Sequence, residues 1–223
     1  MNYDFRFGTL LPYTNQIFDG VLLTLQLSVV TIMIGLVIGV VVAALRTGAP
    51  GPLRALATVY VEAIRNTPIV VQLFIVFFGL PSLGIRFTAS QAAIIGLSIN
   101  LGAYSAEIIR AGIESVRKSQ VEAGHALGLN RYQVFRHVVL FQALKAIYPA
   151  LTSQFILLML MSSIVSIIGA NELFHTASFI DSRTFRSFEV YTAITLIYLC
   201  LTLMFRATFG AVYWAVFVRR PAR

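Results

Sequence analysis

Cysteine and charge are both scarce in this chain. Only 12% of its 223 residues are charged, and 58% are hydrophobic, whereas a soluble domain has about a quarter of its residues charged. The single cysteine, Cys200, excludes a disulfide within the chain. The only lysines are Lys118 and Lys145, and neither follows the glycine pattern of a phosphate-binding loop. A chain this apolar must bury its surface in something larger than itself, so we predict an all-α protein of the lipid bilayer.

Long apolar runs predict about five transmembrane helices. A helix that crosses a bilayer needs about 20 mostly apolar residues. The runs that meet this requirement are Phe18–Leu45, Leu53–Leu80, Thr88–Ile109, Ala146–Gly169 and Phe188–Val218. Pro68 should break the second run, because proline lacks the N–H group that a helix interior requires. We interpret residues 1–223 as a single transmembrane domain.

The basic residues are distributed unequally between the two sides of the predicted spans. Eleven of them fall on one side, namely Arg46, Arg54, Arg110, Arg117, Lys118, Arg131, Arg136, Lys145, Arg219, Arg220 and Arg223. Four fall on the other side, namely Arg6, Arg86, Arg183 and Arg186. Because cytoplasmic segments carry the excess of Lys and Arg, we expect residues 113–141 and the C-terminus in the cytoplasm and the N-terminus outside. This bias accounts for the basic net charge and argues against a nucleic-acid partner.

Residues 113–141 form the part of the chain that is most compatible with water. Ser119 and Glu122 have the spacing of a capping box, which predicts a short helix over Gln120–Leu127 that Gly128 ends. Asn130 repeats the capping signal, so a second helix should begin at about Arg131. Two helices joined by a glycine turn also fit a DNA-binding helix-turn-helix, which we keep as an alternative. A loop with this much structure is expected to bind a partner.

Five motifs in order resemble the permease subunits of ABC importers. The run from Glu122-Ala123-Gly124 through Gly128 to Val138-Val139-Leu140 is similar to the EAA loop of that family. The segments Gly20–Val29, Val61–Phe74, Gly102–Val116 and Ser182–Tyr191 are similar to its polar amino-acid subfamily. The chain departs from the pattern at Gly124, where the family usually has Ala, and at Phe141, where it usually has Pro. Leu160-Met161 also replace a Lys-Asp pair before Ser162-Ser163, which makes the expected substrate class less specific.

The resemblance implies a type I ABC importer transmembrane fold and a set of partners. A cytoplasmic ATPase dimer would bind ATP and Mg²⁺, so we expect this chain to be no enzyme and to bind no cofactor of its own. A second permease subunit, identical or related, and an extracytoplasmic binding protein would complete the importer. Leu127 and Leu129 would be apolar anchors of the coupling helix. The residues implied in ATPase coupling are Ser119, Glu122, Ala123, Gly124, Ala126, Leu127, Gly128 and Leu129.

Polar side chains inside the predicted spans are candidates for a substrate pathway, because such residues are costly in a membrane. The candidates are Glu62, Arg65, Asn66, Thr67, Gln72, Tyr104, Glu107, Ser162 and Ser163. Simpler interpretations remain open: Glu62 could pair with Arg65, Glu107 could pair with Arg110, and the serines could bond to their own helix. No metal site is expected, because His125, His137 and His175 lack the spacing of metal ligands. A stand-alone channel or secondary carrier is the alternative function, although such proteins usually contain internal repeats.

Overall fold

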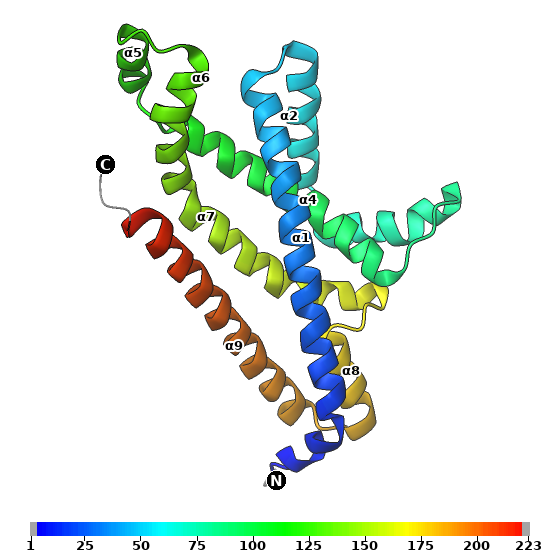
Figure 1. The fold of residues 1–223 in the computed structure, drawn as a ribbon. Helices are drawn as coiled ribbons and strands as arrows, with labels where there is room; N and C mark the ends of the chain where they lie inside the picture. The colour runs from blue at the N-terminus through cyan, green and yellow to red at the C-terminus, as the bar shows by residue number, and fades with distance from the viewer. Residues whose placement is uncertain (1–3, 220–223) are drawn as a thin grey trace. The chain divides into compact units, whose positions relative to one another are not determined.

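A computed structural model gives the fold, and it describes residues 4–219 (Figure 1). Arg220 and Arg223, which the sequence assigns to the cytoplasmic side, lie outside the described residues. Within residues 4–219 the structure contains helices and no β-strand. Four helical stretches among these residues have the length and hydropathy of a membrane crossing, namely Phe7–Gly48, Ala89–Glu114, Arg131–Ile168 and Ser187–Val218. The broken pair Gly51–Arg65 and Ile69–Leu83 makes a fifth when it is counted as one span, which confirms the prediction of about five.

The contacts divide the chain into two compact units that interleave along the sequence. Unit 1 consists of Met1–Met33, Pro68–Leu97 and Phe155–Thr208. Unit 2 consists of Ile34–Thr67, Ser98–Gln154 and Phe209–Arg223. Four helices, α1 (Thr14–Gly48), α4 (Ala89–Glu114), α7 (Leu140–Met161) and α9 (Ser187–Tyr213), contribute residues to both units.

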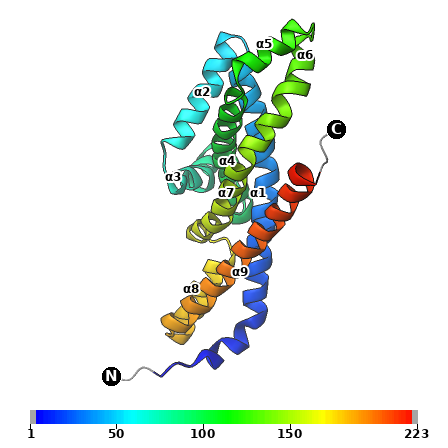
Figure 2. The ribbon, with the colours of Figure 1, turned by 90° about the vertical axis from the view of Figure 1, so that its left-hand side faces the viewer.

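Unit 1 is organised around the short helix α8, Leu173–Thr184. Helices α1 and α8 meet so closely at Gly20 that a Cβ atom there would lie 3.0 Å from the backbone of Leu173. One turn further along α1, the buried Thr24 hydroxyl accepts a hydrogen bond from the Leu173 amide at 3.2 Å. The sequence did not predict this helix, which lies beside the first part of α1 in Figure 2. The other elements of unit 1 are η1 (Phe7–Tyr13), α3 (Ile69–Phe74), η2 (Ile75–Gly79), η3 (Leu80–Leu83) and η5 (Ser162–Ile168).

Unit 2 is held together by close helix contacts at glycines. Gly35 and Gly39 of α1 form a Gly-x3-Gly pair, a spacing that permits close approach of helices in membranes. A Cβ atom on Gly39 would lie 2.5 Å from the Cβ of Ser105 on α4, so no larger residue fits there without movement. The remaining elements of unit 2 are α2 (Gly51–Arg65), α5 (Lys118–Ala126), α6 (Arg131–Val134), η4 (Phe135–Val139) and η6 (Trp214–Val218).

The second span breaks where the sequence predicts. Helix α2 ends at Arg65, and α3 begins at Ile69 directly after Pro68, whose extended backbone forms the N-cap. The Asn66 side chain donates to the Glu62 carbonyl oxygen at 2.8 Å and to the Glu62 carboxylate at 3.1 Å. It thus supplies a hydrogen-bond donor to a backbone carbonyl group at the C-terminal end of α2. The fourth predicted run coincides with the later part of the helical stretch Arg131–Ile168, whose first part is the helix predicted to begin at about Arg131.

Candidate functional site

Helix α5 ends in a turn that depends on glycine. The Gly128 backbone has a φ of +81°, and its amide donates to the His125 carbonyl oxygen at 2.9 Å. The Leu129 amide donates to the Gly124 carbonyl oxygen at 3.2 Å, which completes the pair of bonds of a Schellman motif. The predicted role of Gly128 as the residue that ends this helix is therefore confirmed.

The start of α5 differs from the prediction. The helix begins at Lys118 with Arg117 as its N-cap, and no side chain caps it. Ser119 thus lies inside the first turn, and the predicted capping box between Ser119 and Glu122 is wrong. Tertiary packing overrides the local signal, because Val116 and Val121 pack against a buried cluster with Val139 and Ala143.

The capping prediction for the second helix is confirmed. The Asn130 side chain accepts from the Gln133 amide at 2.9 Å, and the Gln133 side chain accepts from the Asn130 amide at 2.9 Å. Helix α6 begins at Arg131 as expected, and η4 and α7 continue it.

Gly124 fixes α5 against this second helix. It is the buried residue of α5, and a Cβ atom there would lie 3.1 Å from Cγ2 of Val134. The departure of the chain from Ala at this position therefore has a steric reason. It lets the two helices of this segment approach closely.

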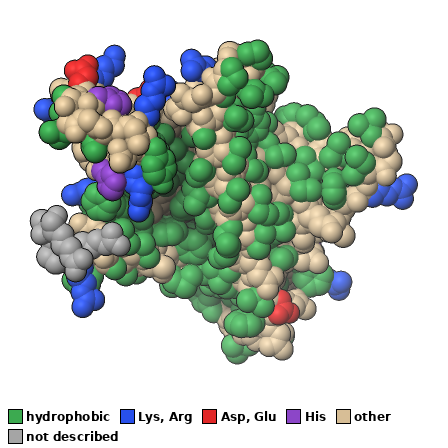
Figure 3. Space-filling view, turned by 45° about the horizontal axis from the view of Figure 1, so that its top comes forward, with side chains coloured by type: hydrophobic (Ala, Val, Ile, Leu, Met, Phe, Trp, Pro, Cys, Tyr) green, Lys and Arg blue, Asp and Glu red, His purple; other side chains and the backbone are tan. Residues whose placement is uncertain are grey.

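The outer surface of α5 is uncovered. Leu127, the residue that directly follows α5, is 81% exposed, so the chain itself leaves this apolar side chain uncovered. Figure 3 shows basic, acidic and histidine side chains gathered over α5 and α6. The other predicted coupling residues on this surface are Ser119, Glu122, Ala123 and Ala126, which are exposed, while Leu129 is half-buried.

A cluster of ion pairs joins α1, α2 and α4 within unit 2. Glu107 accepts from Arg46 and from Arg110, and its Oε2 atom also lies 3.9 Å from the Arg65 guanidinium. Arg65 lies over the ring of Tyr104, with 5.5 Å between the guanidinium carbon and the ring centroid. The predicted pathway residues Arg65, Tyr104 and Glu107 thus come together, and the predicted alternative of a Glu107–Arg110 pair is also realised.

The other predicted pathway residues divide between the two units. In unit 2, the Glu62 carboxylate accepts from Asn66 while Arg65 lies toward Glu107, and Thr67 donates to the Ala63 carbonyl oxygen at 2.8 Å. In unit 1, Gln72 is buried on α3. Ser162 and Ser163 donate to the carbonyl oxygens of Met159 and Leu160, as the simpler interpretation of these serines expects.

Unit 1 contains two buried carboxylates that were not predicted from the sequence. Glu172 is fully buried and caps α8, accepting from the Phe174 amide at 2.8 Å, the His175 amide at 2.7 Å and the Tyr198 hydroxyl at 2.9 Å. Burial raises the pKa of the Glu172 carboxyl, although these hydrogen bonds oppose the shift. Glu189 is also fully buried and accepts from the Arg6 amide at 3.0 Å. The sequence did contain one signal for Glu172: it is an acidic residue that lies between an apolar run and a following amphipathic segment.

Arg46 was missed for a different reason. In the sequence it contributes only to the excess of positive charge on one side of the spans, yet its side chain is 11% exposed and pairs with Glu107. Charge counting treats each basic residue as equivalent, so it could not separate a buried ion-pair partner from a solvated one.

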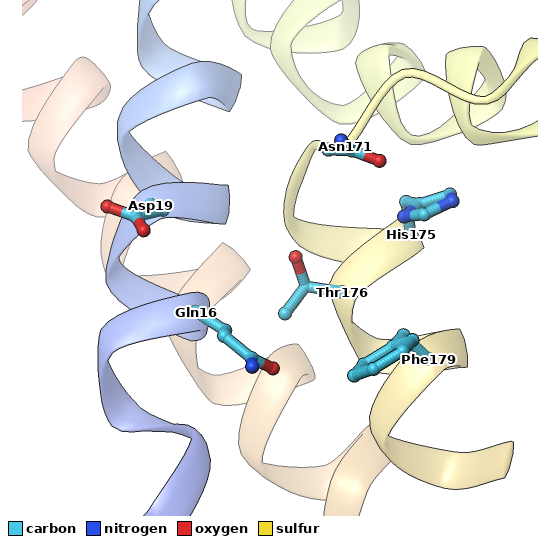
Figure 4. A pocket seen from close by; sticks show the side chains of 6 residues that line it. All are labelled: Gln16, Asp19, Asn171, His175, Thr176 and Phe179. Carbon is cyan, nitrogen blue, oxygen red and sulfur yellow. The ribbon is translucent and has the colours of Figure 1, made fainter. Parts of the chain in front are cut away.

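A shallow pocket lies between α1 and α8 in unit 1. Its volume is about 330 Å³, and Gln16, Asp19, Asn171, His175, Thr176 and Phe179 line it. Figure 4 shows Gln16 and Thr176 projecting into the space between the helices, while His175 projects away from α1. These polar groups do not converge on one point, as the groups of a specific small-molecule site do. Within residues 4–219, no group of three or more His, Cys, Asp or Glu side chains is placed to hold a metal ion.

Comparison with known proteins gives consistent relatives over most of the chain. A family model described as "Binding-protein-dependent transport system inner membrane component" matches residues 35–216. The probable glutamine ABC transporter permease protein GlnM of Bacillus subtilis (strain 168) is 40% identical over 185 residues, which cover 83% of this chain and 86% of that protein. The arginine transport system permease protein ArtQ of the same organism is 37% identical over 205 residues, 92% of this chain and 93% of that protein. The glutamine transport system permease protein GlnP of Escherichia coli (strain K12) is 36% identical over 202 residues, 90% of this chain and 92% of that protein.

Solved structures agree with these relatives. The crystal structure of an amino acid ABC transporter with histidines contains a chain that is 37% identical, with a TM-score of 0.89 and coverage of 97% of this chain and 100% of that one. An inward-facing structure of the MetNI methionine ABC transporter matches with a TM-score of 0.75 at 22% identity, covering 92% of this chain and 98% of that one. The second match supports the fold alone.

Proposed function

The chain belongs to the family of binding-protein-dependent transport system inner membrane components, and from this premise we propose that it is the permease subunit of an ATP-driven importer of polar amino acids. Relatives named as glutamine and arginine permeases support this substrate class. In this proposal the chain is not catalytic, and ATP and Mg²⁺ bind to a separate ATPase dimer. An extracytoplasmic binding protein delivers the solute, and a second permease subunit completes the membrane domain.

The main structural support for this proposal is the way in which α5 is held. This helix is fixed to the helix that starts at Arg131 through Gly124 on one side and leaves Leu127 exposed on the other. A short helix held rigidly at the end of a span is suited to transmit a push along that span. We therefore assign the exposed surface of α5 to the ATPase subunit, with Leu127 as the apolar anchor.

This assignment places α5 and the C-terminus in the cytoplasm and the N-terminus outside. The excess of Lys and Arg on the α5 side of the spans supports this orientation. In the same orientation, Glu172 and α8 lie toward the side from which the binding protein delivers its solute.

We assign the ion-pair cluster around Glu107 to the solute pathway or its inner boundary. Arg65 is its most exposed arginine, at 36% of the side chain, and it lies directly before the broken backbone at Asn66. Unwound backbone at membrane depth is tolerated mainly where it lines a cavity. The position of Arg65 beside this break supports a role for it near the moving solute.

The test is transport by the reconstituted complex. Proteoliposomes that contain this chain with its ATPase and binding protein are expected to import L-glutamine or L-arginine when ATP is supplied, and the chain alone is expected to import neither. Uptake by the chain alone would instead support a stand-alone channel or secondary carrier.

A substitution on α5 tests the coupling surface. Leu127→Asp should abolish ATP-driven uptake and weaken co-purification of the ATPase, because it places an unpaired charge in a buried interface. Phe185→Asp is the matched control, since Phe185 is 86% exposed, belongs to the other unit and lies outside the candidate spans. If both variants kept wild-type uptake, α5 would not be the surface that binds the ATPase.

A further inference from the structure

Arg206 is an isolated charge in the middle of an apolar span. The helical stretch Ser187–Val218 is continuous, and between Glu189 and Arg219 it contains no other charged residue. The Arg206 side chain is exposed and forms no hydrogen bond or ion pair with any residue between 4 and 219. A charge in such a position requires a partner or water, because its transfer into hydrocarbon is costly.

The arginine lies far from either end of this helix. Residues 207–218 follow it in the same helical stretch, which corresponds to about 18 Å at 1.5 Å per residue. Tyr213 and Trp214, the kind of side chains that mark a membrane interface, begin about 10 Å further along by the same rise. Side chains on a helix also tilt toward its N-terminus, so Arg206 leans away from that interface rather than toward it.

Arg206 belongs to a polar stripe on α9, of which Thr195, Leu199 and Arg206 are exposed and Thr192 and Thr202 are half-buried. The buried residues Val190, Ile194, Leu201 and Phe205 recur at helical spacing and face the rest of the chain. Another side of the helix carries Thr192, Thr195, Leu199, Thr202 and Arg206, spaced by three, four, three and four residues. This spacing places all five on one face of the helix, and only Leu199 among them is apolar.

The hydroxyl groups of this stripe are available for further bonds. Thr195 donates to the Tyr191 carbonyl oxygen at 2.7 Å, as a threonine in hydrocarbon is expected to do, and can still accept. Thr192 and Thr202 form no hydrogen bond within residues 4–219. The N-terminal part of the stripe borders a shallow depression of about 320 Å³, lined by Phe188, Tyr191, Thr192, Thr195 and Leu196.

We propose that this stripe of α9 lines a water-filled solute pathway that the second permease subunit completes, and that Arg206 attracts the carboxylate of the transported amino acid. A guanidinium binds a carboxylate through two parallel hydrogen bonds, and every α-amino acid carries that group. The inference rests on the proposed function, since it requires an amino-acid importer with two permease subunits.

Two other environments fit the stripe less well. Dry packing against the same stripe of a second copy would bring Arg206 close to its own symmetry mate, because a two-fold contact is self-complementary. Lipid would leave the guanidinium without a hydrogen-bond partner in the hydrocarbon region. The neighbouring side of α9, with Leu196, Leu203 and Ala207, is uniformly apolar and is the side that suits lipid.

Cysteine labelling distinguishes these environments, and the chain is convenient for it because Cys200 is its single cysteine. In a Cys200→Ser background, Thr195→Cys and Thr202→Cys would be introduced one at a time into the full complex in membranes. The probe is (2-sulfonatoethyl) methanethiosulfonate, which is charged and reacts only where water reaches. Leu203→Cys is the control on the apolar side.

The proposal expects labelling at positions 195 and 202 and none at position 203. Disulfide cross-linking between two copies at position 195 or 202 without labelling would show a dry interface between copies. Absence of both labelling and cross-linking would show that lipid covers the stripe. Either of these results overturns the proposal.

Transport by Arg206 variants tests the charge itself. At saturating solute and binding protein, Arg206→Gln should lower maximal uptake about tenfold, as expected when a charged hydrogen-bond donor is replaced by a neutral one. Arg206→Lys should restore a large part of it, and Arg54→Gln, at an exposed arginine of α2, should change it little. Unchanged uptake by Arg206→Gln in a complex that imports amino acids would refute the role of Arg206 alone, whereas a wild-type complex that imports none would refute the proposed function.

Discussion

Two short helices connect spans in this chain, and they are held in opposite ways. Helix α8 buries Leu173, Thr176, Ala177 and Ile180 against its own chain, and a buried carboxylate caps its start. Helix α5 buries Gly124, and a glycine turn ends it. Helix α8 is therefore packed against its own subunit, whereas α5 presents a surface that the subunit does not cover.

This difference indicates where each helix can tolerate change. The contacts of α8 are internal, so substitutions there should affect the stability of the subunit itself. The contacts of α5 position it, so on the proposed assignment substitutions there should affect the binding of the ATPase. Measurements of stability and of transport on the same variants test this distinction.

The largest effect is expected at the cap of α8. Glu172→Ala removes the acceptor of two backbone amides and of the Tyr198 hydroxyl, and leaving buried donors unsatisfied should cost about 4 kcal/mol of unfolding free energy. Thermal unfolding in detergent, followed by the loss of monodisperse protein on size exclusion, measures the change. The control is Glu114→Ala, whose side chain is 57% exposed, and for which less than about 1 kcal/mol is expected. Equal melting temperatures for the two variants would show that the Glu172 cap does not stabilise α8.

A smaller effect on stability, but a large one on transport, is expected at Gly124. In Gly124→Val the new side chain meets Val134, since even a Cβ atom lies 3.1 Å from its Cγ2, and overpacking of this kind costs about 1–3 kcal/mol. Helix α5 should move outward, so ATP-driven uptake should fall while the spans remain inserted. Gly48→Val is the matched control, because nothing lies within 4 Å of a Cβ atom there. Uptake that survives in Gly124→Val would contradict the view that this contact positions α5.

The turn after α5 should be more tolerant than the contact within it. Gly128 has nothing within 4 Å of a Cβ position, so its substitution adds only backbone strain at a φ of +81°, which amounts to about 1–2 kcal/mol for a β-branched residue. Gly128→Val should therefore reduce coupled uptake, and Gly128→Asn, which tolerates this conformation better, should reduce it less. The ratio of uptake to ATP hydrolysis in proteoliposomes measures both, and the same ratio in Val and Asn variants would argue against strain as the cause.

The smallest expected effect is a pH dependence at α8. Burial raises the pKa of Glu172 in the folded chain above its unfolded value, so the folded state binds the proton more tightly than the unfolded state does. The contribution of Glu172 to stability is then complete below the unfolded pKa of about 4.3, and it decreases as pH rises toward the folded pKa. The melting temperature of the wild type should thus fall relative to that of Glu172→Gln as pH rises above about 4. If the melting temperature of the wild type instead rose relative to that of the variant, the hydrogen bonds to Glu172 would lower its pKa by more than burial raises it.

The local signals of the sequence predicted those parts of the fold that depend on the local chain. Apolar length predicted the spans, Pro68 predicted the break between α2 and α3, and Asn130 and Gly128 predicted the limits of two helices. Each of these features is determined by a few neighbouring residues. The false signal at Ser119 shows the limit of this approach, since packing of Val116 and Val121 against Val139 sets the start of α5.

The parts that the sequence could not predict depend on residues far apart in the chain. The Glu172 carboxylate accepts from the Tyr198 hydroxyl, and the amide of the next residue, Leu173, donates to the Thr24 hydroxyl. These contacts follow no periodic pattern in the sequence. Arg46 meets Glu107 across 61 positions of the sequence. The ion-pair cluster contains residues of both kinds. Arg65 and Glu107 were predicted from the sequence because charged residues are costly in a membrane, but their partner Arg46 could be found only from the fold.

The exposed leucine of α5 also bears on how the cell handles this subunit before assembly. On the proposed assignment of Leu127 to the ATPase interface, a chain synthesised without that ATPase would keep this leucine exposed, and chaperones and proteases would act on the incomplete assembly. In the assembled complex the same leucine would be hidden. On this reasoning, the abundance of the subunit in the membrane should follow the supply of its ATPase.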